Sequence, residues 1–173
     1  MFGWRVELKT IEIRRSYLKR TRITNSIEYI EPTDIHPSKS SAALAISATP
    51  TTVVDLNLSD ADIKSVLQEL RPKRAYTTHF HTDHSRYWQP VKEFSSAEFY
   101  VPGADELMLT NRDSFLDNTF GKHGTREIRD IAYGVLGYKE ISEYQVFEDG
   151  HRIGTGDSAI DCILTPGHSQ GHT

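Results

Sequence analysis

Apolar and polar residues alternate along several short stretches of this chain, with the period of a half-buried β-strand. Other stretches are short apolar or β-branched runs bounded by Pro, Gly, Asp or Ser, which also favours strands. Together these patterns predict strands at residues 5–13, 26–31, 42–48, 51–55, 74–78, 98–101, 144–148, 151–153 and 159–164. Turn formers dominate residues 33–41, which we expect to form a loop.

One helix has clear start and stop signals. Ser59 with Asp62 three positions later approximates a capping box. Apolar residues then recur at the 3.6-residue period up to position 70, and Pro72 ends the run. Weaker helical patterns cover residues 104–116 and 126–136. A strand–helix–strand unit flanked by hairpins predicts an α/β or α+β fold.

Length and composition fit one globular domain. The chain has 173 residues, of which 37% are hydrophobic and 25% charged. The formal net charge of −4 argues against nucleic acid or an anionic membrane as a partner. A local basic cluster could steer an anionic partner, although a solvated surface is the expected explanation; its members are Arg14, Arg15, Lys19, Arg20 and Arg22.

Cysteine usage and hydropathy indicate where the protein works. Cys162 is the only cysteine, so an intrachain disulfide and a cysteine-based zinc cluster are both excluded. No apolar stretch reaches the length of a signal peptide or a membrane span. We therefore expect a soluble, cytoplasmic protein.

The run from residue 79 to residue 84 has the composition of a metal site. It contains His79, His81, Asp83 and His84, directly after a predicted strand. Alternation places the first two imidazoles on one side of an extended backbone, so both can face one ion. Imidazole and carboxylate donors suit Zn²⁺, Fe²⁺ or Mn²⁺. A surface loop or a tag explains a patterned internal run poorly.

A second segment presents another histidine after a strand. In residues 165–168, Thr-Pro-Gly sets a turn and His168 follows it. Such a loop alone is weak evidence. Combined with the first run, it would supply the third imidazole of a His₃ site that keeps one position open for water.

The two motifs HFHTDH and TPGHSQGH together resemble the metallo-β-lactamase superfamily, and the early strand ending at Asp55 matches as well. The resemblance covers about residues 40–173 and implies an α+β fold, an αβ/βα sandwich. It implies that His79, His81 and His168 hold one metal ion, and that Asp83 and His84 help to hold a second. His172 matches a position near the metal that is usually not a ligand.

The resemblance also implies two ligands that this chain lacks. The superfamily completes its site with a bridging Asp and a further His downstream of the TPGH loop, whereas the sequence ends at Thr173. We therefore expect residues 1–173 to form one domain truncated after the first half of the sandwich. A half sandwich would expose a sheet edge and an apolar face. A homo-oligomer or the missing C-terminal half could cover them.

The implied activity is metal-dependent hydrolysis of an ester, thioester, lactone or similar bond in a small-molecule substrate. One or two zinc ions are expected, with iron or manganese as alternatives, and a metal-bound hydroxide would be the nucleophile. Asp83 would orient that nucleophile or bind the second ion, which makes it the candidate catalytic residue. The alternatives are a mononuclear iron oxygenase of the same fold and a non-catalytic metal-binding fragment.

Several residues near these motifs have less specific signals. Asp55 could support the metal loop by hydrogen bonding, or simply end its strand. Tyr87 and Trp88 could line a pocket or pack in the core. The remaining histidines, His36, His123 and His151, are expected at the surface or in turns.

Overall fold

The computed structural model describes residues 18–32, 42–121 and 125–173. The predicted strand at residues 5–13 and the loop at 33–41 lie outside this part of the chain. So do two of the five basic-cluster residues, Arg14 and Arg15. The other three pair with acids: Lys19 with Glu31, Arg20 with Glu69 and Glu28, and Arg22 with Glu28. These pairs agree with a solvated surface.

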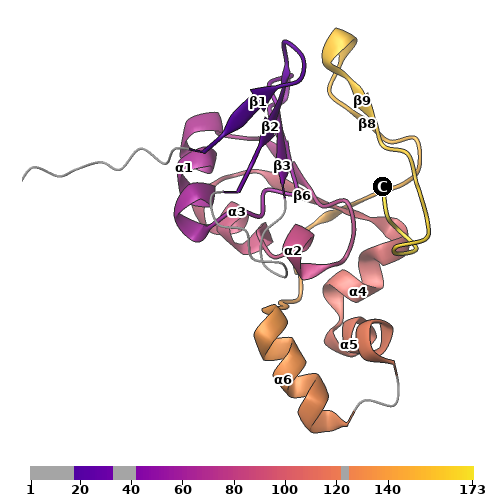
Figure 1. Ribbon diagram of the computed structural model, residues 1–173. Coiled ribbons are helices and arrows are strands. Elements are labelled where there is room, and N and C mark those ends of the chain that lie inside the picture. The colour runs from indigo at the N-terminus through magenta and orange to yellow at the C-terminus, as the bar shows by residue number, and fades with distance from the viewer. Residues whose placement is uncertain (1–17, 33–41, 122–124) are drawn as a thin grey trace, which may run out of the picture.

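A seven-stranded sheet organises the molecule, and its strands lie side by side in chain order. The strands are β1 (Arg20–Arg22), β2 (Ile27–Ile30), β3 (Ala43–Ile46), β4 (Thr52–Val54), β5 (Arg74–Tyr76), β6 (Glu98–Pro102) and β7 (Gln145–Phe147). The first four pair antiparallel, and β4 to β7 pair parallel. A separate hairpin of β8 (Arg152–Ile153) and β9 (Ile160–Asp161) stands beside the sheet (Figure 1).

The helices connect the parallel strands. They are α1 (Asp60–Leu70), α2 (Thr82–Ser85), α3 (Trp88–Phe94), α4 (Glu106–Thr110), α5 (Arg112–Phe120) and α6 (Arg126–Leu136), with 3₁₀ turns at Gly103–Asp105 and Gly156–Ser158. As predicted, α1 starts after Ser59, whose hydroxyl accepts a hydrogen bond from the Asp62 N–H. No helix among the described residues is long and apolar enough to cross a membrane.

Two sequence-based boundaries were wrong. The helix predicted at residues 104–116 is divided into α4 and α5, because Asn111 is extended and its side chain caps α5 by accepting from the Ser114 N–H. The strand predicted at 159–164 is only β9, since the chain leaves the hairpin after Asp161 to form the loop that carries His168. Figure 1 shows α5 and α6 projecting away from the sheet.

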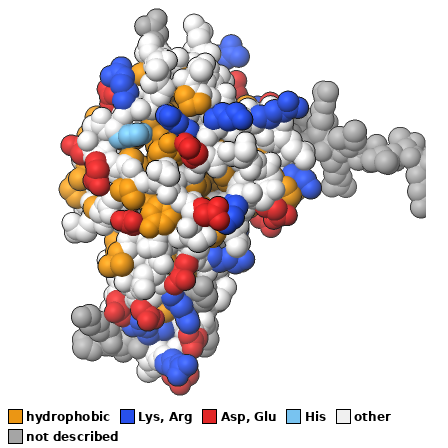
Figure 2. All heavy atoms as spheres, turned by 180° about the vertical axis from the view of Figure 1, so that it is seen from behind, with side chains coloured by type: hydrophobic (Ala, Val, Ile, Leu, Met, Phe, Trp, Pro, Cys, Tyr) orange, Lys and Arg blue, Asp and Glu red, His pale blue; other side chains and the backbone are white. Residues whose placement is uncertain are grey.

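The two faces of the sheet are packed unequally. The larger core lies on the face covered by α1 and α3, and it includes Tyr87 and Trp88, so core packing explains both aromatics. A smaller cluster lies on the opposite face, with Ile46, Tyr76, Phe147, Ile153 and Cys162 among its members. Viewed from the back, hydrophobic side chains gather in the middle of the molecule, while charged ones dominate the lower part (Figure 2).

The parallel strands place three loops at one edge of the sheet. Because β4, β5 and β6 run in the same direction, their carboxyl ends meet at that edge. Asp55 directly follows β4, the His79 loop follows β5, and Asp105 ends the turn after β6. This edge therefore collects polar side chains that are far apart in the sequence.

Candidate metal centre

The first histidine loop is held in place by backbone and side-chain hydrogen bonds. The Thr77 N–H donates to the Tyr100 carbonyl, which continues the pairing of β5 with β6 for one more residue. His81 is the N-cap of α2, and the N–H groups of His84 and Ser85 both donate to its carbonyl. The chain therefore turns sharply between His81 and His84.

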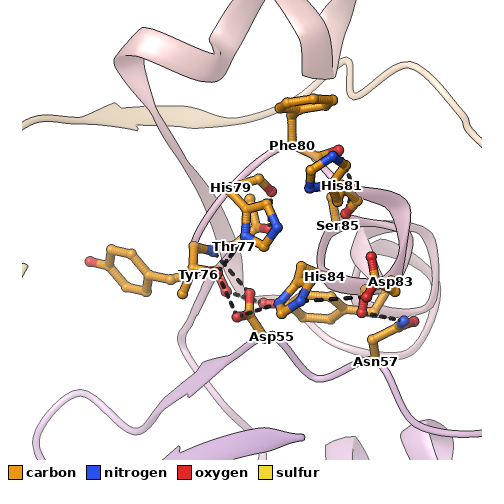
Figure 3. A network of polar contacts seen from close by, with 12 residues as sticks. Asp55, Asn57, Tyr76, Thr77, His79, Phe80, His81, Asp83, His84 and Ser85 are labelled. Atoms are coloured by element: carbon orange, nitrogen blue, oxygen red, sulfur yellow. Dashed lines mark hydrogen bonds and ion pairs between the residues drawn. The ribbon is translucent and has the colours of Figure 1, made fainter. Parts of the chain in front are cut away.

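Three imidazoles from two loops converge at this edge. The candidate ligand atoms of His79, His81 and His168 all lie within 4.8 Å of one another. The centroid of the His168 ring lies 4.9 Å from that of His79 and 4.6 Å from that of His81. The prediction that distant His168 would come within reach of the first run is confirmed. Figure 3 shows His79, His81 and His84 pointing into a common space.

The environment of His79 fits a metal ion. Its Nδ1 lies 3.0 Å from the Thr78 hydroxyl oxygen, and that hydroxyl donates to Asp55 Oδ2 at 2.7 Å. Because the Thr78 hydroxyl donates its hydrogen bond to the carboxylate, its oxygen can accept one from His79 Nδ1–H. His79 Nε2 then carries no hydrogen and keeps its lone pair. This Nε2 is buried and has no hydrogen-bond partner among the described residues. A buried polar atom without a partner is costly, and coordination to a metal ion would satisfy it.

The protonation of the histidines agrees with that fit. Burial, with help from the neighbouring histidines, lowers the pKa of His79 from 6.5 to about 2. Burial and the nearby His168 also lower the pKa of His81. Both rings are therefore neutral at physiological pH, which is the form that binds metals.

Asp83 and His84 lie beside the three converging imidazoles. The His84 ring centroid is 4.2 Å from that of His79, and its Nε2 is 3.5 Å from Asp83 Oδ2. Burial lowers the pKa of His84, but the hydrogen bond from its ring to Asp55 and the charges of Asp55 and Asp83 outweigh it, so this pKa is raised. Asn57 fixes α2 by donating to the Asp83 carbonyl. The pair offers one oxygen and one nitrogen to a second ion.

Asp55 connects His84 with His79. Its carboxylate accepts from the N–H and the hydroxyl of Thr78, and Oδ2 also lies 2.9 Å from His84 Nδ1. It therefore contacts His84 directly, as Figure 3 shows, and reaches His79 through the Thr78 hydroxyl. The supporting role that the sequence suggested for Asp55 matches this geometry.

The chain is similar in structure to solved metallo-β-lactamases. The chain is 20% identical to the native FEZ-1 metallo-β-lactamase from Legionella gormanii, with a TM-score of 0.59 over 88% of this chain and 55% of that chain. It is 23% identical to the metallo-β-lactamase GOB-18 from Elizabethkingia meningoseptica, with a TM-score of 0.65 over 89% and 53%. The chain has a metallo-β-lactamase fold. The α+β prediction is thereby confirmed.

The similarity covers only part of the solved structures. This chain spans about half the length of the two lactamases. A third structure with this fold was solved in a di-iron-bound form, and it is 20% identical with a TM-score of 0.56 over 82% of this chain and 64% of that chain. No protein-family model and no curated protein matches the sequence. Of these three comparisons, the comparison with solved structures therefore supports the resemblance that the two motifs had indicated.

One residue of this edge was missed by the sequence reasoning. Asp105 is fully buried and contacts both histidine loops. A sequence signal exists, since Asp105 is an acid four residues beyond the end of the strand predicted at 98–101, and Asp55 likewise lies at the end of a predicted strand. Nothing in the sequence indicates its partners, which are up to 66 residues away.

The remaining histidines lie outside the convergent triad. The His172 ring is 5.0 Å from that of His79, but its Nδ1 is 2.9 Å from the Thr165 hydroxyl. His151 contacts the Tyr76 hydroxyl at 3.0 Å within the smaller apolar cluster. His36 and His123 are outside the described residues.

Proposed function

We propose that this chain carries the metal-binding part of a metal-dependent hydrolase acting on an ester, thioester, lactone or similar bond of a small molecule. The observation that supports this most is the convergence of three imidazoles around a buried His79 Nε2 that has no hydrogen-bond partner among the described residues. The metallo-β-lactamase fold supports it independently.

His79, His81 and His168 would hold the first ion. When bound, a divalent cation acts as a Lewis acid and lowers the pKa of a coordinated water to about 7. Two of these imidazoles have lowered pKa values, so they need not lose a proton before binding. His168 is exposed, which leaves the site open to solvent and substrate on that side.

Asp83 is the proposed catalytic residue. Its side chain is 30% exposed, and its Oδ2 faces the space beside His84 Nε2. A carboxylate in this place can orient a water molecule by accepting its hydrogen bond, or it can bind a second ion together with His84. The anchoring of α2 by Asn57 keeps the Asp83 backbone fixed.

The donor set does not select one metal. Imidazole and carboxylate suit zinc, iron and manganese, and the only cysteine lies in the smaller apolar cluster. We propose zinc because three imidazoles with an open fourth position are a common catalytic zinc arrangement. The di-iron form of one neighbour keeps iron as the second choice.

A matched pair of variants tests the assignment. We expect His168→Ala to abolish tight binding of Zn²⁺ and of Fe²⁺, measured by titration of metal-free protein, because it removes one of three ligands. His172→Ala should bind almost as well, because His172 lies outside the triad. Equal affinities in the two variants would contradict the ligand set.

The reaction is tested separately on the metal-loaded protein. Hydrolysis of any member of a panel of thioesters, lactones and phosphodiesters, lost in Asp83→Asn, would support the proposal. Oxygen uptake without hydrolysis would favour the iron oxygenase instead. Metal binding without either reaction would favour a non-catalytic metal-binding module.

A further inference from the structure

The buried carboxylate of Asp105 accepts three hydrogen bonds. The Phe80 N–H donates to Oδ2 at 3.0 Å, the Ser169 hydroxyl donates to Oδ2 at 2.6 Å, and the Gly171 N–H donates to Oδ1 at 2.7 Å. The side chain forms no ion pair with Lys or Arg among the described residues. A buried carboxylate without a cation needs such donors to satisfy its oxygens.

These donors come from the two loops that carry the metal-binding histidines. Phe80 lies between His79 and His81, and Ser169 directly follows His168. One carboxylate therefore joins the loop after β5 to the loop after β9. Besides this connection, the Thr173 N–H donates to the Thr78 carbonyl at 3.2 Å. That contact is a single, longer backbone hydrogen bond, so Asp105 is the stronger connection.

Gly171 shows how closely the second loop approaches Asp105. A Cβ atom at this position would lie 2.7 Å from the Asp105 backbone nitrogen and 2.8 Å from its Cγ. Real side chains do not pack at such distances, and the obstructing atoms include backbone. Gly171 is therefore required for the approach, and any side chain there would push the His168 loop away from the His79 loop.

We propose that Asp105 is a positioning residue that sets the spacing between His168 and the histidine pair His79 and His81, and thereby the metal affinity of the site. This inference rests on the proposed metal-binding function. Residues that orient metal ligands typically change metal affinity 10–100-fold when replaced. Asparagine cannot substitute, because its amide NH₂ would face an N–H or hydroxyl donor where the carboxylate had accepted.

The test compares the zinc affinity of three variants with that of the wild-type chain. Competition with a chromogenic chelator gives the dissociation constant for Zn²⁺, and circular dichroism shows that each variant is folded. We expect Asp105→Asn and Gly171→Ala to bind zinc about 10–100-fold more weakly. The control is Asp62→Asn, which makes the same chemical change at a carboxylate 5% exposed in α1, away from the site. It should lower stability and leave zinc affinity unchanged.

A spectroscopic measurement separates positioning from general stability. The visible absorption of Co²⁺-loaded protein reports the geometry around the ion, so it should change in Asp105→Asn and Gly171→Ala but not in Asp62→Asn. If Asp105→Asn fails to fold, Gly171→Ala and Ser169→Ala still test the connection.

The outcomes distinguish the two proposals. Weaker zinc binding and an altered cobalt spectrum in the Asp105 and Gly171 variants, beside an unaffected Asp62 variant, would support the positioning role. Equal zinc affinities in the wild-type chain and in the Asp105 and Gly171 variants would overturn the positioning role but not the proposed function. A wild-type chain that binds no zinc would overturn the proposed function and the positioning role together.

Discussion

Asp55 adopts a backbone conformation that a non-glycine residue rarely takes. Its φ is 49°, in the left-handed region, where an ordinary side chain costs about 1–3 kcal/mol. Three hydrogen bonds, from two groups of Thr78 and from the His84 ring, hold the carboxylate there. Because the same oxygen serves His84 and Thr78, one residue orients two proposed ligands of neighbouring ions.

Replacing that carboxylate tests this arrangement. In Asp55→Asn, one oxygen becomes a donor, so Thr78 and His84 can no longer both be satisfied. We expect metal affinity to fall about 10–100-fold. Chelator competition measures the change, and Asp113→Asn, an exposed acid in the first turn of α5, is the control. Unchanged affinity in Asp55→Asn would show that the histidines are oriented without it.

The lowered pKa of His79 makes the metal-free protein sensitive to acid. The unfolded chain takes up a proton at this residue near its ordinary pKa of 6.5, whereas the folded chain does so only near 2. The lowered pKa of His79 therefore does not affect the free energy of unfolding above about pH 6.5, and it reduces that free energy increasingly as the pH falls below 6.5. The free energy of unfolding should decrease by up to about 1.4 kcal/mol per pH unit from this group.

Urea unfolding of the metal-free protein at about pH 7 and about pH 5 measures this loss. His79→Gln, which cannot take up the proton in either state, should show a smaller decrease. His84 acts in the opposite direction, because its raised pKa contributes stability below 6.5 that is lost as the pH rises through the folded value. An equal slope in the wild type and His79→Gln would contradict the assignment.

At the scale of elements, the sequence predicted those helices and strands whose positions depend on neighbouring residues. The start of α1 and the strands β2 to β7 follow from periodicity and capping, and the first histidine run is contiguous in the sequence. His168 was expected as the third imidazole because it follows a strand and a Thr-Pro-Gly turn, and the resemblance to a known superfamily supported that expectation. Asp105 was missed because its contacts are made at separations of 25 to 66 residues, which no local pattern reveals.

The helices that were wrongly predicted or missed also depend on contacts between distant residues. The break at Asn111 was missed because the apolar pattern continues across it, while the structure leaves Leu107 61% exposed. Helix α3 was not predicted because Tyr87 precedes it without a side-chain cap, and Pro90 lies in its first turn, where it is tolerated. Burial of Trp88 and Val91 against the core stabilises this helix instead.

The capping of α1 gives a prediction at this scale. Ser59→Ala should lower the free energy of unfolding by about 0.5–2 kcal/mol, because the Asp62 N–H loses its acceptor. Ser59→Gly should lose only a few tenths of a kcal/mol. Chemical denaturation measures both, and metal affinity should not change in either. A Ser59→Ala variant as stable as the wild type would show that the cap contributes nothing here.

At the scale of the whole molecule, the two faces of the sheet are covered unequally. The chain spans about half the length of the lactamases it resembles, and the smaller apolar cluster lies on the less covered sheet face. Ile163, 66% exposed, and Leu164, 36% exposed, lie just before the His168 loop. We propose that residues 1–173 form one domain of this fold, and that a second copy of the chain or another protein surface covers these exposed residues.

The proposed second-ion site predicts a difference in catalysis. Asp83 and His84 are the two residues proposed to hold that ion, and their Oδ2 and Nε2 atoms lie 3.5 Å apart. We expect residues 1–173 to bind metal and to hydrolyse substrates slowly. A longer polypeptide that adds the bridging Asp and the further His of the superfamily should be about 10²–10³-fold faster, as for other transition-state stabilisers. Measured kcat/KM values that are equal in the two would show that the second ion is dispensable.

The tight approach at Gly171 also restricts how related sequences can differ. No side chain fits between this residue and Asp105, so the residue type at one position restricts the residue type at the other, although the two are 66 residues apart in the sequence. Gln170, next to it, is exposed. In a library of random substitutions selected for metal binding, position 171 should therefore retain glycine and position 105 aspartate, while position 170 accepts most residues. An aspartate just past a strand, paired with a distant Ser-x-Gly after a histidine, is thus a signature by which distant members could be found.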